Sequence, residues 1–197
     1  MNLANKITIS RIILTFVFIF LLSFPFPNNW HLWTKAASLV VFLLAALSDL
    51  LDGKIAQKWN MVTDFGKLMD PIADKMLVLS AFLVFVQMGL IAGWMVVIIV
   101  ARELLITSLR LFALNKGKVL SAAKSGKHKT FSQMLLIIII LSFIVFKEFC
   151  KVYASWNPYW EKGFIWAVNI VMWFVVILTL WSGLSYLWKN RKVIANI

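Results

Sequence analysis

The chain has 197 residues, and 62% of them are hydrophobic, which gives a mean hydropathy of +0.88. Because a soluble domain of this size is roughly half apolar, the composition argues against a soluble protein and predicts an all-α integral membrane protein. The net charge of +12 raises the question of a nucleic-acid partner, and the positions of the charges along the chain argue against one.

Six apolar stretches predict six transmembrane helices, since a helix that rises about 1.5 Å per residue needs roughly 20 residues to cross a bilayer of about 30 Å. In chain order they are about Ile9–Phe24, Lys35–Leu51, Ile72–Leu90, Gly93–Leu114, Phe131–Phe146 and Phe164–Trp188. Pro25 and Pro27 close the first stretch, which lacks a small-residue cleavage site and is therefore expected to be a retained helix. The intervals are too short for a separate soluble domain, so we expect residues 1–197 to form a single membrane domain.

Basic residues gather on one side of the predicted membrane if the N-terminus is cytoplasmic. The cytoplasmic side receives Lys6, Arg11, Lys54, Lys58, Lys67, Lys75, Arg110, Lys116, Lys118, Lys124, Lys127, Lys129, Lys189, Arg191 and Lys192. The opposite side receives Lys35, Lys147, Lys151 and Lys162. This asymmetry is the positive-inside pattern, so membrane topology explains the net charge and we expect no nucleic-acid partner.

Five of the eight acidic residues fall in one window, "SDLLDGKIAQKWNMVTDFGKLMDPIADK". Asp49 and Asp52 are three apart at the expected cytoplasmic end of the second helix, and Asp70 and Asp74 are four apart at the expected start of the third. Residues at these spacings share a helix face. The short connection predicts that the two pairs converge, and four carboxylates would repel unless a hard, oxygen-preferring cation such as Mg²⁺ or Mn²⁺ offset them.

A structural role is the alternative for any single aspartate. Asp70 precedes Pro71, so it would make a good N-cap with proline at the first helical position. Asp64 is expected in a solvated loop. For the four aspartates together we favour a polar metal site at the cytoplasmic side of the membrane, because ionisable residues near a bilayer are costly and usually functional.

The complete pattern resembles the signature of the CDP-alcohol phosphotransferases, D-x-x-D-G-x-x-A-R, eight residues, then G-x-x-x-D-x-x-x-D. Here Asp49-x-x-Asp52-Gly53-x-x-Ala56 is followed, after Gln57 and an eight-residue spacer, by Gly66-x-x-x-Asp70-x-x-x-Asp74. The six-helix count also fits this family. Gln57 stands where the family has arginine; it can donate a hydrogen bond but carries no charge.

The resemblance implies a phosphotransfer, in which a hydroxyl attacks the phosphorus of a CDP-linked lipid and displaces CMP. Two divalent ions would neutralise the anionic groups and align the attack. By the family pattern Asp49, Asp52 and Asp70 hold the metals, and Asp74 is the general base and also touches the second metal. The residues expected to line the CDP-lipid site are Gly53, Ala56, Gln57 and Gly66.

A second informative region joins "ARELLITSLR" to "NKGKVLSAAKSGKHKT". Arg102 and Glu103 interrupt an apolar run, and because adjacent helical residues diverge by about 100° we expect no obvious pairing between them; a buried structural ion pair stays open as an alternative. Arg110, Lys127 and Lys129 lie on the side of the membrane expected for the aspartates. A cationic pocket there suits an acceptor that carries a phosphate.

Within the family, four segments resemble the glycerol-phosphate branch: "NKITISR", "KWNMVTDFGKLMDPIADK", "RELLITSLR" and "GKHKTFSQM". That branch implies CDP-diacylglycerol and glycerol-3-phosphate as substrates, and membership of the family implies a homodimer. Because the acidic cluster and the basic loop fall on the same side as most basic residues, we expect an active site that faces the cytoplasm from the cell inner membrane. One alternative keeps the chemistry with another acceptor, such as inositol phosphate or serine. A divalent-cation transporter is disfavoured, because the second half of the chain has no acidic cluster to match the first.

Overall fold

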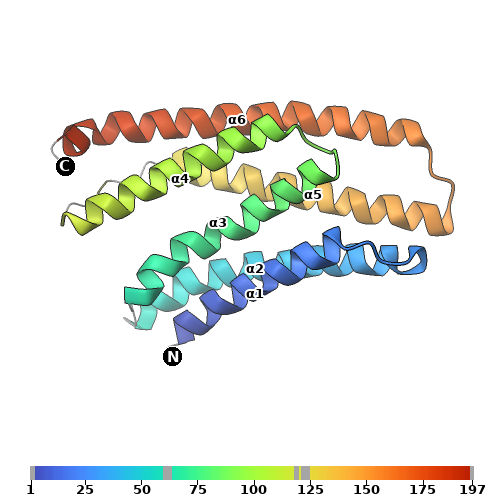
Figure 1. Ribbon diagram of the computed structural model, residues 1–197, viewed down its shortest axis with the longest axis horizontal. Coiled ribbons are helices and arrows are strands. Elements are labelled where there is room, and N and C mark those ends of the chain that lie inside the picture. The colour runs from blue at the N-terminus through green and yellow to red at the C-terminus, as the bar shows by residue number, and fades with distance from the viewer. Residues whose placement is uncertain (1–2, 60–63, 118–119, 121–124, 196–197) are drawn as a thin grey trace. The chain divides into compact units, whose positions relative to one another are not determined.

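The computed structural model describes residues 3–59, 64–117, 120 and 125–195, without the side chains of 3–7, 49–59, 64–68, 70, 71, 74, 125–128, 192 and 195 (Figure 1). This part of the chain forms six α-helices, one short 3-10 helix and no strands, which confirms the predicted all-α fold and the number of helices. The elements are α1 (Leu3–Ser23), η1 (Asn28–Trp30), α2 (His31–Trp59), α3 (Asp64–Gln87), α4 (Gly93–Asn115), α5 (Ser125–Tyr153) and α6 (Pro158–Ala195). Long apolar runs fold this way because a helix satisfies its backbone polar groups within the segment.

The chain divides into two compact units, one formed by residues 1–84 and 137–158 and the other by 85–136 and 159–197. In the first unit α1 packs along α2, and the rings of Phe18 and Phe42 meet with centroids 5.6 Å apart, both fully buried. α1 ends at Ser23, before Pro25 and Pro27, as the sequence predicts. The Lys35 ammonium donates to the carbonyl oxygen of Leu22 and so satisfies one carbonyl group in the last turn of α1.

α2 and α3 are longer than the sequence predicts. The hydropathy pattern places the end of the second helix near Leu51, whereas α2 continues to Trp59. The third helix is expected from about Ile72, whereas α3 begins at Asp64. Asp64 is therefore the first residue of a helix and not a loop residue. Asp70 lies inside α3, so the N-cap alternative for this residue is wrong.

Pro71 lies inside α3 without ending it. The proline lacks the N–H that would donate to the carbonyl oxygen four residues earlier, but its fixed φ is a helical value. One missing bond in a helix of 24 residues is a local loss. The helix therefore continues through Pro71, and the polar segment that contains the aspartate motif is helical on both sides of residues 60–63.

In the second unit α4 and α6 run in the same direction, and residues that contact each other across the two segments differ in number by an almost constant amount. Asn169 donates to the carbonyl oxygen of Leu90 at 3.2 Å, and the rings of Trp94 and Trp173 lie 4.9 Å apart. Further along, Arg102 donates to Ser182 at 2.8 Å. These pairs are 79, 79 and 80 positions apart, so the two helices stay in register over more than two turns.

Two stretches of the described chain, Asn28–Ser48 and Pro158–Arg191, are long and apolar enough to cross a bilayer by length and composition. Thr8–Ser23 and Lys75–Gln87 are shorter apolar helices. These segments agree with the composition of a membrane-bound protein. The passage of all six helices through a bilayer stays a prediction.

Candidate functional site

The residues that define the aspartate motif lie on helical backbone on both sides of residues 60–63. Asp49, Asp52, Gly53, Ala56 and Gln57 are in α2, and Gly66, Asp70 and Asp74 are in α3. The side chains of all these residues lie outside those the structure describes, so their metal-binding and nucleotide-binding roles stay predictions. Among the side chains that are described, no three acidic, histidine or cysteine residues gather as metal ligands.

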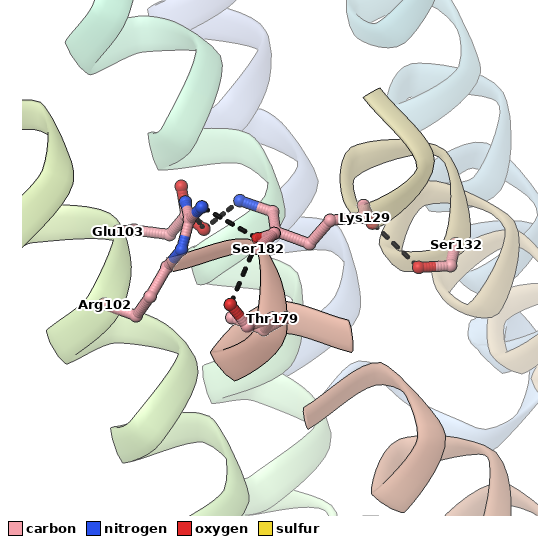
Figure 2. A network of polar contacts seen from close by, with 6 residues as sticks. All are labelled: Arg102, Glu103, Lys129, Ser132, Thr179 and Ser182. Atoms are coloured by element: carbon pink, nitrogen blue, oxygen red, sulfur yellow. Dashed lines mark hydrogen bonds and ion pairs between the residues drawn. The ribbon is translucent and has the colours of Figure 1, made fainter. Parts of the chain in front are cut away.

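A network of buried charges joins two helices of the second unit (Figure 2). Glu103 on α4 accepts a hydrogen bond from Nη1 of Arg102 at 3.2 Å through its Oε1 atom. The same oxygen accepts from the ammonium group of Lys129 on α5. The three side chains are 12%, 8% and 5% exposed in the order Arg102, Glu103 and Lys129. Burial of charged groups is tolerated when they are paired in this way.

Arg102 also reaches α6. Its Nη2 atom donates to Oγ of Ser182 at 2.8 Å, and Ser182 in turn donates to the carbonyl oxygen of Thr179 at 3.1 Å. The Arg102 stem lies against Gly183, where an added Cβ would be 3.2 Å from Cγ of Arg102. Arg102 therefore makes contacts on α4 and α6, and Glu103 extends the same network to α5 (Figure 2).

The expectation that Arg102 and Glu103 would not pair is wrong. Their Cα–Cβ vectors diverge, but an arginine side chain is long enough to bend back to its neighbour, and burial favours that conformation because it places opposite charges together. The alternative of a buried ion pair is therefore the one observed. Its further partners, Lys129 and Ser182, are 26 and 80 positions away in sequence and could not be read from local spacing.

The three predicted acceptor-binding residues have different surroundings. Lys129 is 4% exposed and joined to Glu103. Arg110 is exposed, and its guanidinium carbon lies 5.8 Å from the centroid of the Tyr186 ring, within the range of a cation–π contact. The side chain of Lys127 lies outside the described residues. Arg110 is seven positions after Glu103, so the two share a face of α4.

α6 carries a buried polar stripe that the sequence analysis does not identify. Thr179, Ser182, Tyr186 and Asn190 are 0%, 1%, 2% and 3% exposed. Their spacing of three, four and four positions places them on one helical face. Polar residues at helical spacing in an apolar segment are the signal that would have revealed this stripe.

Several buried polar atoms of the second unit have no hydrogen-bond partner among the described residues. They are Arg102 Nε, Gln133 Nε2, Thr179 Oγ1 and Tyr186 Oη. Buried polar groups are normally paired with protein or water, so these atoms mark positions that a water molecule or a polar ligand would satisfy. Two cationic side chains of the described network, Arg102 and Lys129, are groups of the kind that bind an anion such as a phosphate.

Comparison with known proteins identifies one matching family and several similar proteins. The family model described as CDP-alcohol phosphatidyltransferase matches residues 1–182. The chain is 35% identical over 206 residues to the Bacillus subtilis (strain 168) protein "CDP-diacylglycerol--glycerol-3-phosphate 3-phosphatidyltransferase", with 98% of this chain and 97% of that protein covered. A protein of the same name from Salmonella typhimurium is 33% identical over 199 residues, with 96% and 95% covered.

A "Probable phosphatidylglycerophosphate synthase" from Mycobacterium tuberculosis is also similar. It is 38% identical over 136 residues, which cover 69% of this chain and 64% of that protein. The similarity to the Bacillus and Salmonella proteins extends over almost the whole of each chain.

Proposed function

Since the chain belongs to the CDP-alcohol phosphatidyltransferase family, we propose that it transfers the phosphatidyl group of CDP-diacylglycerol to glycerol-3-phosphate. The products are CMP and phosphatidylglycerol phosphate. The observation that carries this proposal is the similarity, over 98% of the chain, to a relative whose name states this reaction. The enzyme is thus a transferase of phospholipid biosynthesis.

The transfer exchanges one bond to phosphorus for another. A hydroxyl oxygen of glycerol-3-phosphate forms a bond to the phosphorus that carries the diacylglycerol, and the bond from that phosphorus to the CMP oxygen breaks. The hydroxyl proton must leave during the attack, and a carboxylate can accept it. We assign this role to Asp74, which follows Asp70 by one turn of α3. CMP leaves as an anion with the electrons of the broken bond.

Members of this family generally depend on divalent cations, and the motif supplies suitable ligands. Asp49, Asp52, Asp70 and Asp74 would hold two ions, Mg²⁺ or Mn²⁺, because hard cations prefer carboxylate oxygens. When bound, such ions neutralise the pyrophosphate and the leaving group. Asp52 is seven positions before the end of α2, and Asp70 is six positions after the start of α3. At about 1.5 Å per residue, Asp52 and Asp70 are each about 10 Å along their helix from the segment that connects α2 to α3. These equal distances support a single site to which both helices contribute.

The CDP-lipid would lie against the small residues of the motif. Gly53, Ala56 and Gly66 have little or no side chain, and so allow a nucleotide to approach the helix backbone closely. Gln57 would donate a hydrogen bond to the nucleotide or the pyrophosphate, in place of the ionic contact of the family arginine. We expect Gln57 to contribute less to lipid binding than an arginine would, since hydrogen bonds between neutral groups are weaker than charge-assisted ones.

The acceptor phosphate would be held by Arg110, Lys127 and Lys129. The buried network supports this assignment, because it keeps Lys129 beside a second cation, Arg102, with one carboxylate between them. A phosphate monoester is anionic and accepts charge-assisted hydrogen bonds, so it is a suitable ligand for these cations. Free glycerol would leave these cations unpaired and should be a much poorer acceptor.

The remaining proposals concern the setting of the enzyme. We expect residues 1–197 to act as one catalytic domain with six transmembrane helices in the cell inner membrane. The metal site and the acceptor site would face the cytoplasm, in agreement with the positive-inside distribution of charges. The enzyme is expected to be a homodimer.

The experiment that tests the proposal is CMP release by the purified protein. CDP-diacylglycerol is supplied in detergent micelles with glycerol-3-phosphate, glycerol, inositol phosphate or serine as the acceptor. We expect rapid release with glycerol-3-phosphate alone, its loss in EDTA, and its recovery when Mg²⁺ or Mn²⁺ is added in excess. A faster reaction with inositol phosphate or serine would contradict the proposed acceptor, and metal-independent release would contradict the metal site.

A further inference from the structure

Glu103 is a buried carboxylate that the proposed reaction does not use. It lies on α4, is 6% exposed as a residue, and receives both Arg102 and Lys129 on the same oxygen atom. Lys129 is a proposed ligand of the acceptor phosphate, whereas Glu103 itself is anionic and would repel that phosphate. Its contribution to the reaction must therefore be indirect.

We propose that Glu103 is a positioning residue for the acceptor step, which holds the ammonium group of Lys129 and the guanidinium of Arg102 in place for the phosphate of the acceptor. This inference rests on the proposed function, since it requires a phosphate-bearing acceptor. Two long cationic side chains in one buried place repel each other. The carboxylate between them offsets that repulsion and selects one conformation for each side chain.

Contacts with three helices restrict the movement of the Arg102 and Lys129 side chains. Arg102 is fixed at its far end by Ser182, which is 1% exposed, and along its stem by Gly183. Lys129 lies one turn before Gln133 on α5, another buried polar residue. Arg102 can turn away only by breaking its buried contacts with Glu103 on α4 and Ser182 on α6. Lys129 on α5 can turn away only by breaking its buried contact with Glu103.

Among the described side chains, the network holds two cations on either side of one carboxylate. An acceptor phosphate therefore meets a site that is attractive but already organised, and it does not have to gather two mobile cations as it binds. Preorganisation of this kind lowers the cost of binding. Its loss should appear mainly in the KM for the acceptor and much less in the KM for the lipid.

The test compares initial-rate kinetics of Glu103→Gln and Glu103→Asp with Glu148→Gln as the matched control. Glu148 is also paired with a lysine, Lys151, at 2.8 Å, but it lies near the end of α5 in the first unit. For Glu103→Gln we expect the KM for glycerol-3-phosphate to rise about fivefold to tenfold, because charge-assisted hydrogen bonds are roughly twice as strong as neutral ones. The lipid KM should change less than twofold. Glu103→Asp should recover part of the loss, and the control should behave as wild type.

A charge swap separates positioning from a purely structural role. The double variant Glu103→Lys with Lys129→Glu restores an ion pair, so its Tm should return toward that of wild type. Its acceptor KM should remain high, because a carboxylate at position 129 repels the phosphate. Recovery of the acceptor KM in the swap would overturn the inference, as would an unchanged acceptor KM in Glu103→Gln.

Binding of inorganic phosphate gives a readout that needs no turnover. Wild type should gain Tm as phosphate is added, and Glu103→Gln should need about fivefold to tenfold more phosphate for the same gain. Equal phosphate dependence in the two proteins would also overturn the inference. If wild type shows no release of CMP that depends on glycerol-3-phosphate, the proposed function fails instead, and the two failures are thereby distinguished.

Discussion

Substitution of Gly183 by alanine tests whether the Arg102 side chain packs as closely against α6 as the structure indicates. The new Cβ would lie 3.2 Å from Cγ and 3.3 Å from Nε of Arg102, closer than ordinary van der Waals contact. The stem of Arg102 must shift, and its guanidinium is held at the far end by Ser182 at 2.8 Å. We therefore expect Gly183→Ala to weaken or break this buried hydrogen bond.

The expected magnitude follows from two opposing effects. Alanine in place of glycine favours a helix by about 0.5–1 kcal/mol. Loss of a hydrogen bond to a charged group costs about 1.5–3 kcal/mol. The net loss for Gly183→Ala is about 0.5–2.5 kcal/mol, which lowers Tm by about 1–10 °C in a chain of this size, because 1 kcal/mol corresponds to about 2–4 °C.

Gly163 is the matched control, since it lies on the same helix and a Cβ there would meet nothing within 4 Å. Gly163→Ala should raise Tm by about 1–4 °C through helix propensity alone. The assay is thermal unfolding of both variants in the same detergent. In an Arg102→Ala background the clash is absent, so Gly183→Ala should stabilise as Gly163→Ala does. Stabilisation by Gly183→Ala in the wild-type background would refute the reasoning.

Four further variants test the proposed site. Asp49→Ala should abolish CMP release and weaken Mn²⁺ binding, and near-normal turnover at saturating metal would remove Asp49 from the site. Asp74→Asn should lower kcat about 10²-fold with CDP-diacylglycerol still bound; failure to bind the lipid would make Asp74 mainly a metal ligand. Gln57→Arg should stay active and bind the lipid at least as tightly, and a folded but inactive enzyme would contradict this. Arg110→Ala should raise the acceptor KM about tenfold or more, whereas Lys116→Ala, which removes an exposed cation near the end of the same helix, should not.

The number of helices could be predicted from the sequence, whereas many of their boundaries could not, since α2, α3, α5 and α6 all extend past the expected stretches. Apolar runs show where a chain prefers lipid, and six of them lead to the six helices of the described chain. Hydropathy does not show where a helix ends, because polar residues such as Lys54, Gln57 and Lys58 continue a helix as readily as apolar ones. The loop expected around Asp64 is helical from Asp64 onward for the same reason.

One part of the candidate site could likewise be predicted from the sequence, and another part could not. The aspartate motif is a local pattern within 26 residues, so sequence spacing alone led to it. The network of Arg102, Glu103, Lys129 and Ser182 joins three helices, and its contacts depend on how those helices pack. Sequence spacing could mark Arg102 and Glu103 as unusual in an apolar segment, but not name the residues that they bind.

The offset between α4 and α6 explains why these partners come together. Position 102 of α4 lies level with positions near 182 on α6, since the contacts at Leu90 and Trp94 give an offset of 79. At that level α6 presents Ser182, which accepts from the guanidinium, and Gly183, which leaves room for the stem. A bulkier residue at position 183 or an apolar one at position 182 would remove one of the two conditions. The small and polar residues of α6 therefore determine where a buried arginine of α4 can lie, and through Glu103 they also determine where Lys129 is held.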